Sequence, residues 1–276
     1  MRMKGIRSIR ERACDVDPRL RKFCLIEDDE RGYSRSVLSR FNRRVGAERL
    51  RRIINEKVVM LLRRSEVEKV DMILNTSFIK AVSIRHPRDD MRGFSDPDAR
   101  VGWHGRDYNL GCKLHVSVDH QRILPLASVL ALANEKRHGP TLIERIREIL
   151  RKAGARLRSL VADSQYSSGR MWGLVDETVI PFMANQRQGE NVLWVDKKFR
   201  TQGPEEKRVR YYMRPVVEAA YAFLKNQYGI AVNKDGSLGS VVVYALYSVL
   251  CHVLTKEAAE HIGRPEKALS PTFFNT

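Results

Sequence analysis

Four side chains in the last third of the chain have a spacing that would place them on one face of a helix. They are Tyr211, Arg214, Glu218 and Lys225, at relative positions 0, 3, 7 and 14. At roughly 100° per residue, these offsets fall within about 60° of one another. One carboxylate would then lie beside a guanidinium, an ammonium and a phenol, which suits a metal ion held against a phosphate backbone. The simpler alternative is an amphipathic helix with two ion pairs in its exposed stripe.

A second candidate for chemistry is Asp163. It ends the apolar run Leu160-Val-Ala and is followed by Ser164. In open α/β sheets, ligands bind at the carboxyl ends of the strands, so an acid delivered at that edge is well placed to act. Asp and Ser are also common helix caps, and this is the structural alternative for Asp163.

The charge balance points to a polyanionic partner. The chain of 276 residues carries 50 Lys and Arg against 33 Asp and Glu, a net charge of +17. Basic surfaces gain affinity for nucleic acids because each phosphate that is neutralised releases condensed counterions. RNA binding of the ribosomal type, or a generally Arg-rich proteome, would produce the same balance.

Cysteine usage and hydropathy bound the compartment. The cysteines include no C-x-x-C pair, which favours a reducing cytosol over a disulfide framework or a zinc site (Cys14, Cys24, Cys112 and Cys251). The N-terminus lacks the apolar run of a signal peptide. The longest apolar stretch, Gly239 to Leu254, includes two Tyr, two Ser and a His and predicts a buried helix. We therefore expect a cytoplasmic, nucleoid-associated protein with no membrane partner.

The N-terminal part of the chain predicts a basic helical hairpin after an irregular lead-in over residues 1–33. Apolar residues at helical spacing indicate helices over residues 34–46 and 47–64, with a break at Gly46. Arginines are interleaved on the other faces (Arg40, Arg43, Arg44, Arg51 and Arg52). This face would either contact DNA or be a solvated surface.

From residue 68 the pattern predicts an α/β arrangement that would position the candidate residues. The expected strands are 70–82, 109–119, 123–132, 158–163 and 179–183, and the expected helices are 140–153, 208–228 and 240–261. Residues 184–207 are expected to form a loop. Pro215 should kink the helix that carries Glu218, or begin it. Three meandering strands followed by alternating helix and strand indicate a mixed sheet covered on both faces.

Several motifs resemble those of DDE-type insertion-sequence transposases. Asp163 and the Tyr-Arg-Glu-Lys spacing are similar to the second and third acidic positions of the subgroup with that signature. The strand Asn109-Leu-Gly-Cys-Lys-Leu-His-Val-Ser-Val-Asp119 is similar to the G-x-K-L-H-x-x-x-D strand of such proteins. Leu124-Pro-Leu-Ala and Ala133-Asn-Glu also match. The resemblance covers roughly residues 70–255.

This resemblance implies a fold and an organisation. It implies an RNase H-like mixed β-sheet of about five strands flanked by helices and preceded by a small α-helical N-terminal region. We expect residues 1–67 to form that region, residues 68–262 the catalytic domain, and residues 263–276 a C-terminal tail.

The resemblance also implies a reaction. Three acids would hold two Mg²⁺ (or Mn²⁺) ions for in-line attack on a DNA phosphodiester, in a metal-dependent cleavage and strand transfer at the ends of an insertion sequence. Asp163 and Glu218 are the expected metal ligands. Tyr211, Arg214 and Lys225 are the expected contacts to double-stranded DNA, at transposon ends and target. A homodimer assembled on DNA is the expected state.

The sequence departs from the family pattern at the first acid. Relatives have a stretch like Asp-x-Ser-Phe-Ile-Lys-Ala, whereas this chain begins it with Asn75. Asn75 thus stands at the first of the three catalytic positions, before Asp163 and Glu218. Its neutral amide should weaken the two-metal site. Asp71 lies on the same strand face but roughly 13 Å away, and Asp119 falls at a hairpin turn, where Asp has structural uses.

Three functions remain open from the sequence. The first is an active transposase. The second is a decayed copy that folds and binds DNA but is catalytically impaired at Asn75. The third, an RNA-binding protein with coincidental motifs, is disfavoured because the aromatic stacking platforms of RNA modules are absent.

Overall fold

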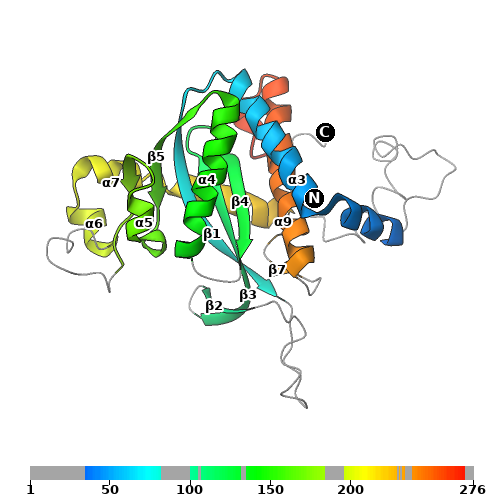
Figure 1. The fold of residues 1–276 in the computed structure, drawn as a ribbon, viewed down its shortest axis with the longest axis horizontal. Helices are drawn as coiled ribbons and strands as arrows, with labels where there is room; N and C mark the ends of the chain where they lie inside the picture. The colour runs from blue at the N-terminus through cyan, green and yellow to red at the C-terminus, as the bar shows by residue number, and fades with distance from the viewer. Residues whose placement is uncertain are drawn as a thin grey trace, which may run out of the picture.

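The computed structural model describes residues 35–81, 100–104, 107–131, 135–183, 196–228, 230, 232–233 and 238–270. The expected lead-in over residues 1–33 and the motif at Ala133 and Asn134 lie outside these residues, as do Cys14 and Cys24. Between them, the described segments form one mixed sheet with helices on both faces (Figure 1).

Seven strands form the sheet, in the order β2-β3-β1-β5-β6, with β4 paired to β3 and β7 paired to β1. β3 is antiparallel to β1, β2 and β4, while β5 and β7 are parallel to β1 and β6 is parallel to β5. The strand bounds are β1 Lys69–Ala81, β2 Arg100–His104, β3 Asp107–Asp119, β4 Leu124–Ala131, β5 Arg156–Ala162, β6 Glu177–Val179 and β7 Val232–Asn233.

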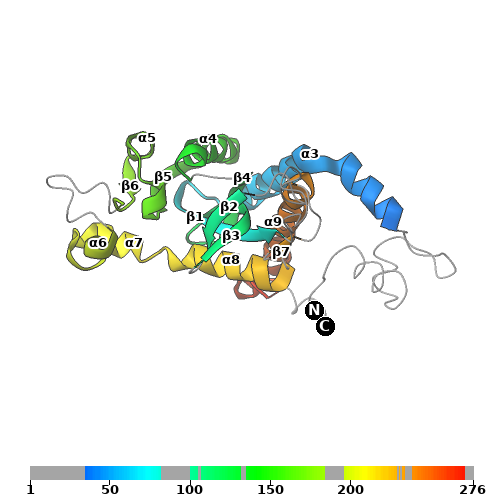
Figure 2. The same ribbon diagram turned by 90° about the horizontal axis from the view of Figure 1, so that it is seen from below.

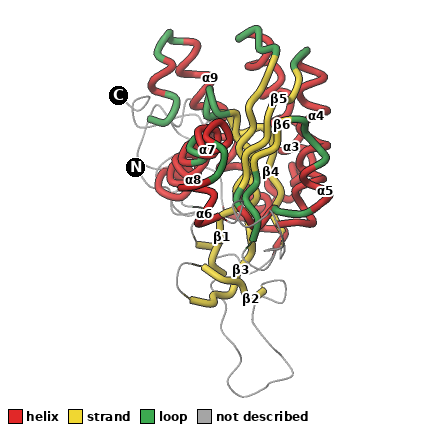
Figure 3. The backbone as a smooth tube through the Cα atoms, turned by 90° about the vertical axis from the view of Figure 1, so that its left-hand side faces the viewer, coloured by secondary structure: helices red, strands yellow, loops and turns green. Residues whose placement is uncertain are grey.

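The helices form the outer layers. They are α3 Arg35–Arg64, α4 Glu135–Ala153, α5 Gly169–Trp172, α6 Asp196–Gln202, α7 Glu205–Tyr211, α8 Pro215–Tyr228 and α9 Leu238–His261, with short 3-10 helices η2 Ser164–Tyr166 and η5 Pro265–Lys267. Figure 2 shows α4 on one side of the strands and α8 on the other. The paired ends of β2 and β3 extend beyond the helical layers, as the tube in Figure 3 makes clear. The order of elements and the two-sided cover are those of an RNase H-like α/β fold.

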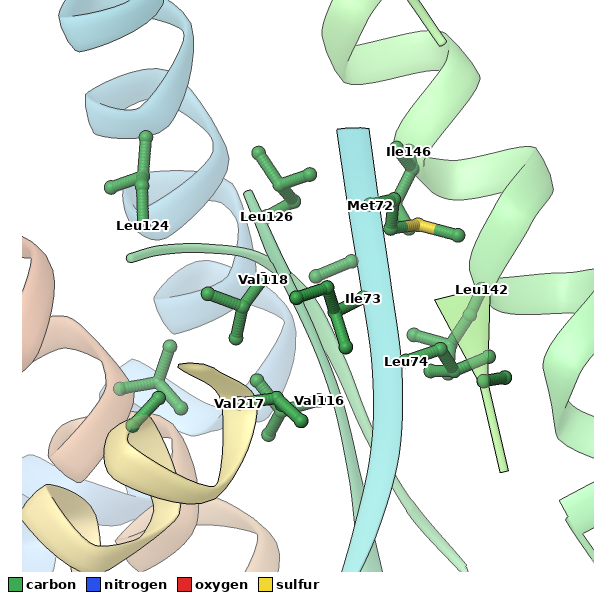
Figure 4. Packing of buried hydrophobic residues seen from close by; sticks show 14 of the residues in the cluster. Met72, Ile73, Leu74, Val116, Val118, Leu124, Leu126, Leu142, Ile146 and Val217 are labelled. Carbon is green, nitrogen blue, oxygen red and sulfur yellow. The ribbon is translucent and has the colours of Figure 1, made fainter. Parts of the chain in front are cut away.

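Alternation along β1 explains this layering. Met72 and Leu74 point toward α4, where they lie beside Leu142 and Ile146, while Ile73 points to the opposite side (Figure 4). Val116 and Val118 of β3 lie on that opposite side with Val217 of α8. These side chains are all buried and belong to a single hydrophobic cluster. Because successive strand residues face opposite layers, Asn75 shares the α8 side with Ile73.

The observed elements match most of the expected ones. β2 and β7 had no expected counterpart, and four further differences concern segments for which an element or a loop was expected. The two N-terminal helices run on as α3, which bends at Gly46, whose φ of 62° is accessible to glycine. Helix α6 lies within the segment expected to be a loop. The strand expected over residues 179–183 is β6, which is shorter and begins earlier. The helix expected over residues 208–228 is divided between α7 and α8, and α8 begins at Pro215. Proline lacks the N–H that a continuous helix would need at that point, so it starts a new one.

Helix α9 packs against α3, β4 and α8. By length and composition alone it could cross a membrane. In this fold, however, one side of it is buried, including Val241, Ala245, Val249 and Val253. The second half of α3 also contributes core residues, such as Leu50 and Val58, to the same cluster. The division at residue 67 stays a prediction.

Candidate active site

Asn75 and Asp163 lie where the pairing between the parallel strands β1 and β5 ends, although β1 itself continues to Ala81. The last registered pair between β1 and β5 is Leu74 with Ala162. Asn75 and Asp163 are the next residue on each strand, so their side chains leave the sheet on the same face, the one that α8 covers. Asn75 is 8% exposed, and its Oδ1 accepts a hydrogen bond from the backbone N of Thr76 at 2.8 Å.

Asp163 is held as the N-cap of η2. Its backbone is extended, with φ −78° and ψ 170°, and its Oδ1 accepts a hydrogen bond from Gln165 N at 2.9 Å. The capping role proposed as the structural alternative is therefore real. It does not exclude chemistry, because a carboxylate has two oxygens and about four lone-pair sites.

Tyr221 fixes α8 over β1 and β3 next to Asn75. Its buried hydroxyl accepts from Val116 N at 2.9 Å and faces the carbonyl oxygens of Asn75 at 2.7 Å and Leu114 at 2.8 Å. Burial raises the pKa of Tyr221 well above its usual value, and the charge of Asp163 adds to this rise. The hydroxyl therefore stays protonated, and it links the helix to the backbone of both β1 and β3.

Arg214 forms hydrogen bonds with two other predicted site residues, Tyr211 and Glu218, and its charge interacts with that of Asp163. Its guanidinium donates to Tyr211 Oη and to Glu218 Oε1, both at 2.9 Å, and it lies 5.6 Å from the centre of the Tyr211 ring. Burial disfavours its charged form, but Tyr211, Glu218 and Asp163 outweigh this and raise the pKa of Arg214. The charge of Asp163 thus acts on both Arg214 and Tyr221.

Lys225 lies on the same face of α8, two turns beyond Glu218, a rise of about 10 Å. Burial lowers the pKa of its ammonium. Lys225 is half-buried, whereas Glu218 is exposed. The face derived from spacing therefore exists from Arg214 to Lys225, although α8 itself begins only at Pro215. Tyr211 joins it through the hydrogen bond from Arg214 rather than through a continuous helix.

Some residues around the candidate site could not be recognised from the motifs. Tyr221 was missed, although its spacing of three from Glu218 and four from Lys225 places it on the same face. His115 and Tyr166 were also missed. Both are fully buried, and Tyr166 Oη lies 2.7 Å from His115 Nδ1. The motif strand contains His115, but its periodicity says nothing about which residue it would contact.

The two alternative acids have structural partners. Asp71 Oδ1 accepts from Arg158 Nε at 2.7 Å and from Ser159 Oγ at 2.6 Å, and the hydrogen bond from Arg158 is the largest of the effects that lower the pKa of Asp71. Asp119 is buried and paired with Arg122 at 2.9 Å beside the β3–β4 turn. Neither replaces the missing first acid.

Within the residues that the structure describes, no three His, Cys, Asp or Glu side chains group closely enough to hold a metal ion. One reason is that the third member of the cluster is the amide of Asn75. Another is that Glu218 is turned toward Arg214. The oxygen donors next to each other here are therefore the carboxylate of Asp163 and the amide of Asn75, while the carboxylate of Glu218 is ion-paired with Arg214.

The fold is an RNase H-like α/β fold, with polar residues beside the β1–β5 pairing and on the covering helix α8. Residues 77–254 match the model of the family described as "Transposase DDE domain". This match spans more than half of the chain, and the protein belongs to that family. The matched segment contains Asp163 and Glu218 and begins two residues after Asn75. Neither the search of curated proteins nor that of solved structures returned a match.

Proposed function

We propose that the protein cuts and joins double-stranded DNA at the ends of an insertion sequence, and that Asn75 impairs the catalysis of this copy. Family membership supplies the transposase role. The finer proposal assigns Asp163 and Glu218 as ligands of a divalent metal ion. Asn75 occupies the position of the first acid.

The observation that carries this proposal is the register of β1 with β5. Leu74 pairs with Ala162, and Asn75 and Asp163 are the residues that follow them. By alternation, both side chains would face α8. Tyr221 and Arg214 then bring α8 to that same point. These contacts support a common location for three motifs that are far apart in the sequence, at the kind of sheet edge where ligands of α/β proteins bind.

The donor set suits a hard divalent cation but not a pair of them. Carboxylate and amide oxygens are preferred ligands of Mg²⁺ and Mn²⁺. However, Asn75 Oδ1 accepts a hydrogen bond from Thr76 N, and an amide has only this one oxygen to offer. It cannot bridge two ions as a carboxylate does. When bound, a metal ion would activate the attacking oxygen and stabilise the leaving oxygen.

The residues of the chain itself would bind and orient DNA. The raised pKa of Arg214 keeps it charged, so it can hold a phosphate oxygen once Glu218 has left the ion pair. Lys225 would add a second phosphate contact two turns along α8. Glu218 must exchange its ion pair with Arg214 for a metal ligand bond, and its exposure leaves room for that rotation. A DNA phosphate arriving at Arg214 would favour the exchange. We propose that the assembled complex contains two copies of the chain.

The second candidate function is a decayed copy that binds DNA without cutting it. Asn75 favours it, since the lost charge removes a bridging ligand. A loss of roughly 3 kcal/mol in transition-state stabilisation corresponds to at least a hundredfold in rate.

The experiment compares the native protein with Asn75→Asp on DNA that includes the sequences flanking the gene, with Mg²⁺ or Mn²⁺ present. Asp and Asn are nearly isosteric, so the substitution restores charge without repacking β1. We expect Asn75→Asp to nick this DNA at least a hundredfold faster than the native protein. Asp163→Ala in the Asn75→Asp background is the control and should abolish nicking. Equal rates of the native and Asn75→Asp proteins would mean that another group supplies the first ligand, and no nicking by either would contradict the proposed reaction.

A further inference from the structure

The turn that contains Asp163 is held by a buried hydrogen bond between Tyr166 and His115. Tyr166, the last residue of η2, is fully buried, and its hydroxyl lies 2.7 Å from Nδ1 of His115 on β3. The two rings meet edge to face with centroids 6.0 Å apart. Burial, and to a lesser extent His138 and Lys113, lower the pKa of His115 to about 3, so the ring is neutral at physiological pH.

Tyr166 and Asp163 belong to the same hydrogen-bonded turn. Tyr166 N donates to the Asp163 backbone oxygen at 3.1 Å, and Gln165 N donates to Asp163 Oδ1 at 2.9 Å. A movement of Tyr166 out of its place would therefore loosen the bond that sets the rotation of the Asp163 side chain.

The hydrogen bond between His115 and Tyr166 joins β3 to the turn after β5, on the face of the sheet opposite to Asn75 and Asp163. β1 separates β3 from β5, and His115 is opposite Thr76, the residue after Asn75. Alternation puts His115 on the α4 side, while Asn75 and Asp163 face α8. The start of α4 closes the space around the turn, since a Cβ at Gly139 would come within 2.6 Å of Met171 Sδ and 3.2 Å of Tyr166 Cδ1.

We propose that the His115–Tyr166 hydrogen bond holds the Asp163 carboxylate in the orientation that faces α8, which makes His115 and Tyr166 positioning residues. This rests on the proposed function only in taking Asp163 as a metal ligand. The packing around Gly139 limits where the Tyr166 ring can go, and the hydrogen bond to His115 fixes it within that space. Without this hydrogen bond, the Tyr166 ring keeps its apolar contacts but no directional interaction fixes its orientation.

Tyr166→Phe tests the bond with the least disturbance, because it removes the hydroxyl and keeps the ring. We expect amide hydrogen exchange at residues 165 and 166 to become at least tenfold faster. The amides of Leu160 and Val161 in β5 should stay protected, and the unfolding midpoint should shift by only a few degrees. Tyr247→Phe is the matched control, because it removes a hydroxyl bonded to Asn42 Oδ1 at 3.1 Å. It should leave exchange at residues 165 and 166 unchanged.

Two substitutions at His115 add a rescue test. His115→Asn keeps a polar atom near the position of Nδ1, whereas His115→Leu does not. Exchange at residues 165 and 166 should be close to native in His115→Asn and fast in His115→Leu. Native exchange in Tyr166→Phe, or equal exchange in the two His115 variants, would overturn the proposal.

Mn²⁺ titration of Asn75→Asp, with and without Tyr166→Phe, separates this inference from the proposed function. We expect Tyr166→Phe to weaken Mn²⁺ binding at least fivefold. If Asn75→Asp binds Mn²⁺ equally well with and without Tyr166→Phe, and amide exchange at residues 165 and 166 stays at the native rate, the positioning role is wrong and the proposed metal site is unaffected. Fast exchange in Tyr166→Phe together with no Mn²⁺ binding by Asn75→Asp would support the pinning of the turn and contradict the metal site.

Discussion

One acidic residue lies near the start of the paired segment of β1 and β5 and another just beyond its end, and their surroundings differ. At one end, Asp71 accepts hydrogen bonds from Arg158 and Ser159 and is 7% exposed. At the other, Asp163 follows β5 with a backbone amide on Oδ1 and lies in the field of Arg214, which also binds Glu218. Both acids lie on the α8 face of the same strand pair. The partners of each acid, rather than its place on the sheet, separate a structural carboxylate from a candidate metal ligand.

The largest effect should appear in a stability comparison of Asp71→Asn and Asp163→Asn. Asp71→Asn removes the charge from a mostly buried, charge-assisted pair and should lower the free energy of unfolding by about 2 kcal/mol. Asp163→Asn should cost less than about 0.5 kcal/mol, because Asn caps a helix as well as Asp does. Urea unfolding at pH 7 measures both. Similar losses of unfolding free energy in Asp71→Asn and Asp163→Asn would contradict the different roles assigned to the two acids.

The next effect concerns DNA binding at the Asp163 end. Arg214→Ala with Lys225→Ala removes two expected phosphate contacts, so the slope of log affinity against log salt should fall by about 1.8. Between 50 and 200 mM salt this amounts to about tenfold in affinity. Fluorescence anisotropy with duplex DNA gives the slope. Arg264→Ala, which removes a cation paired with Glu266, is the control and should leave it unchanged. An unchanged slope in the double variant would place the DNA on another surface.

The smallest effect is a pH dependence confined to the Asp71 end. The pKa of Asp71 is lowered from its ordinary value of 3.8, with the Arg158 hydrogen bond as the main cause. A lowered carboxyl pKa stabilises the fold above the unfolded pKa, and this contribution is lost as the pH falls through the folded pKa. The destabilisation caused by Asp71→Asn should therefore be constant from pH 7 to about pH 5 and shrink below pH 4, by less than about 1 kcal/mol. A penalty that is unchanged at pH 3 would contradict the ion-pair explanation.

The sequence predicted much of the fold because its periodicities are strong. The alternation in residues 109–119 and the helical spacing in residues 140–153 both led to the observed β3 and α4. Pro215 was recognised as a kink or a start, and it begins α8. Helix α6 was not predicted, because residues 196–202 are charged and have little apolar periodicity. Short β2 was missed because its five residues include Gly102 and are too few to show a clear alternation.

The candidate site was predictable in its members but not in its geometry. The motif resemblance named Asp163, Glu218 and Asn75, but only the register of β1 with β5 puts Asn75 beside Asp163. Tyr221 Oη reaches the backbone of two strands, and a contact between side chain and backbone leaves no trace in local spacing. The placement of Tyr166 against His115 likewise depends on strand order, which no local pattern encodes.

The central claim is that Asn75 stands where a metal-binding acid is missing beside Asp163. Mn²⁺ binding measured by isothermal titration calorimetry on the native protein, Asn75→Asp and Asn75→Asp with Asp163→Ala tests it directly and needs no DNA. We predict that Asn75→Asp binds Mn²⁺ at least tenfold more tightly than the native protein, because a carboxylate adds both a charge and a second oxygen. Asp163→Ala should return the affinity to the native level or below. Equal affinity of the native and Asn75→Asp proteins, or a gain that survives Asp163→Ala, would contradict the account.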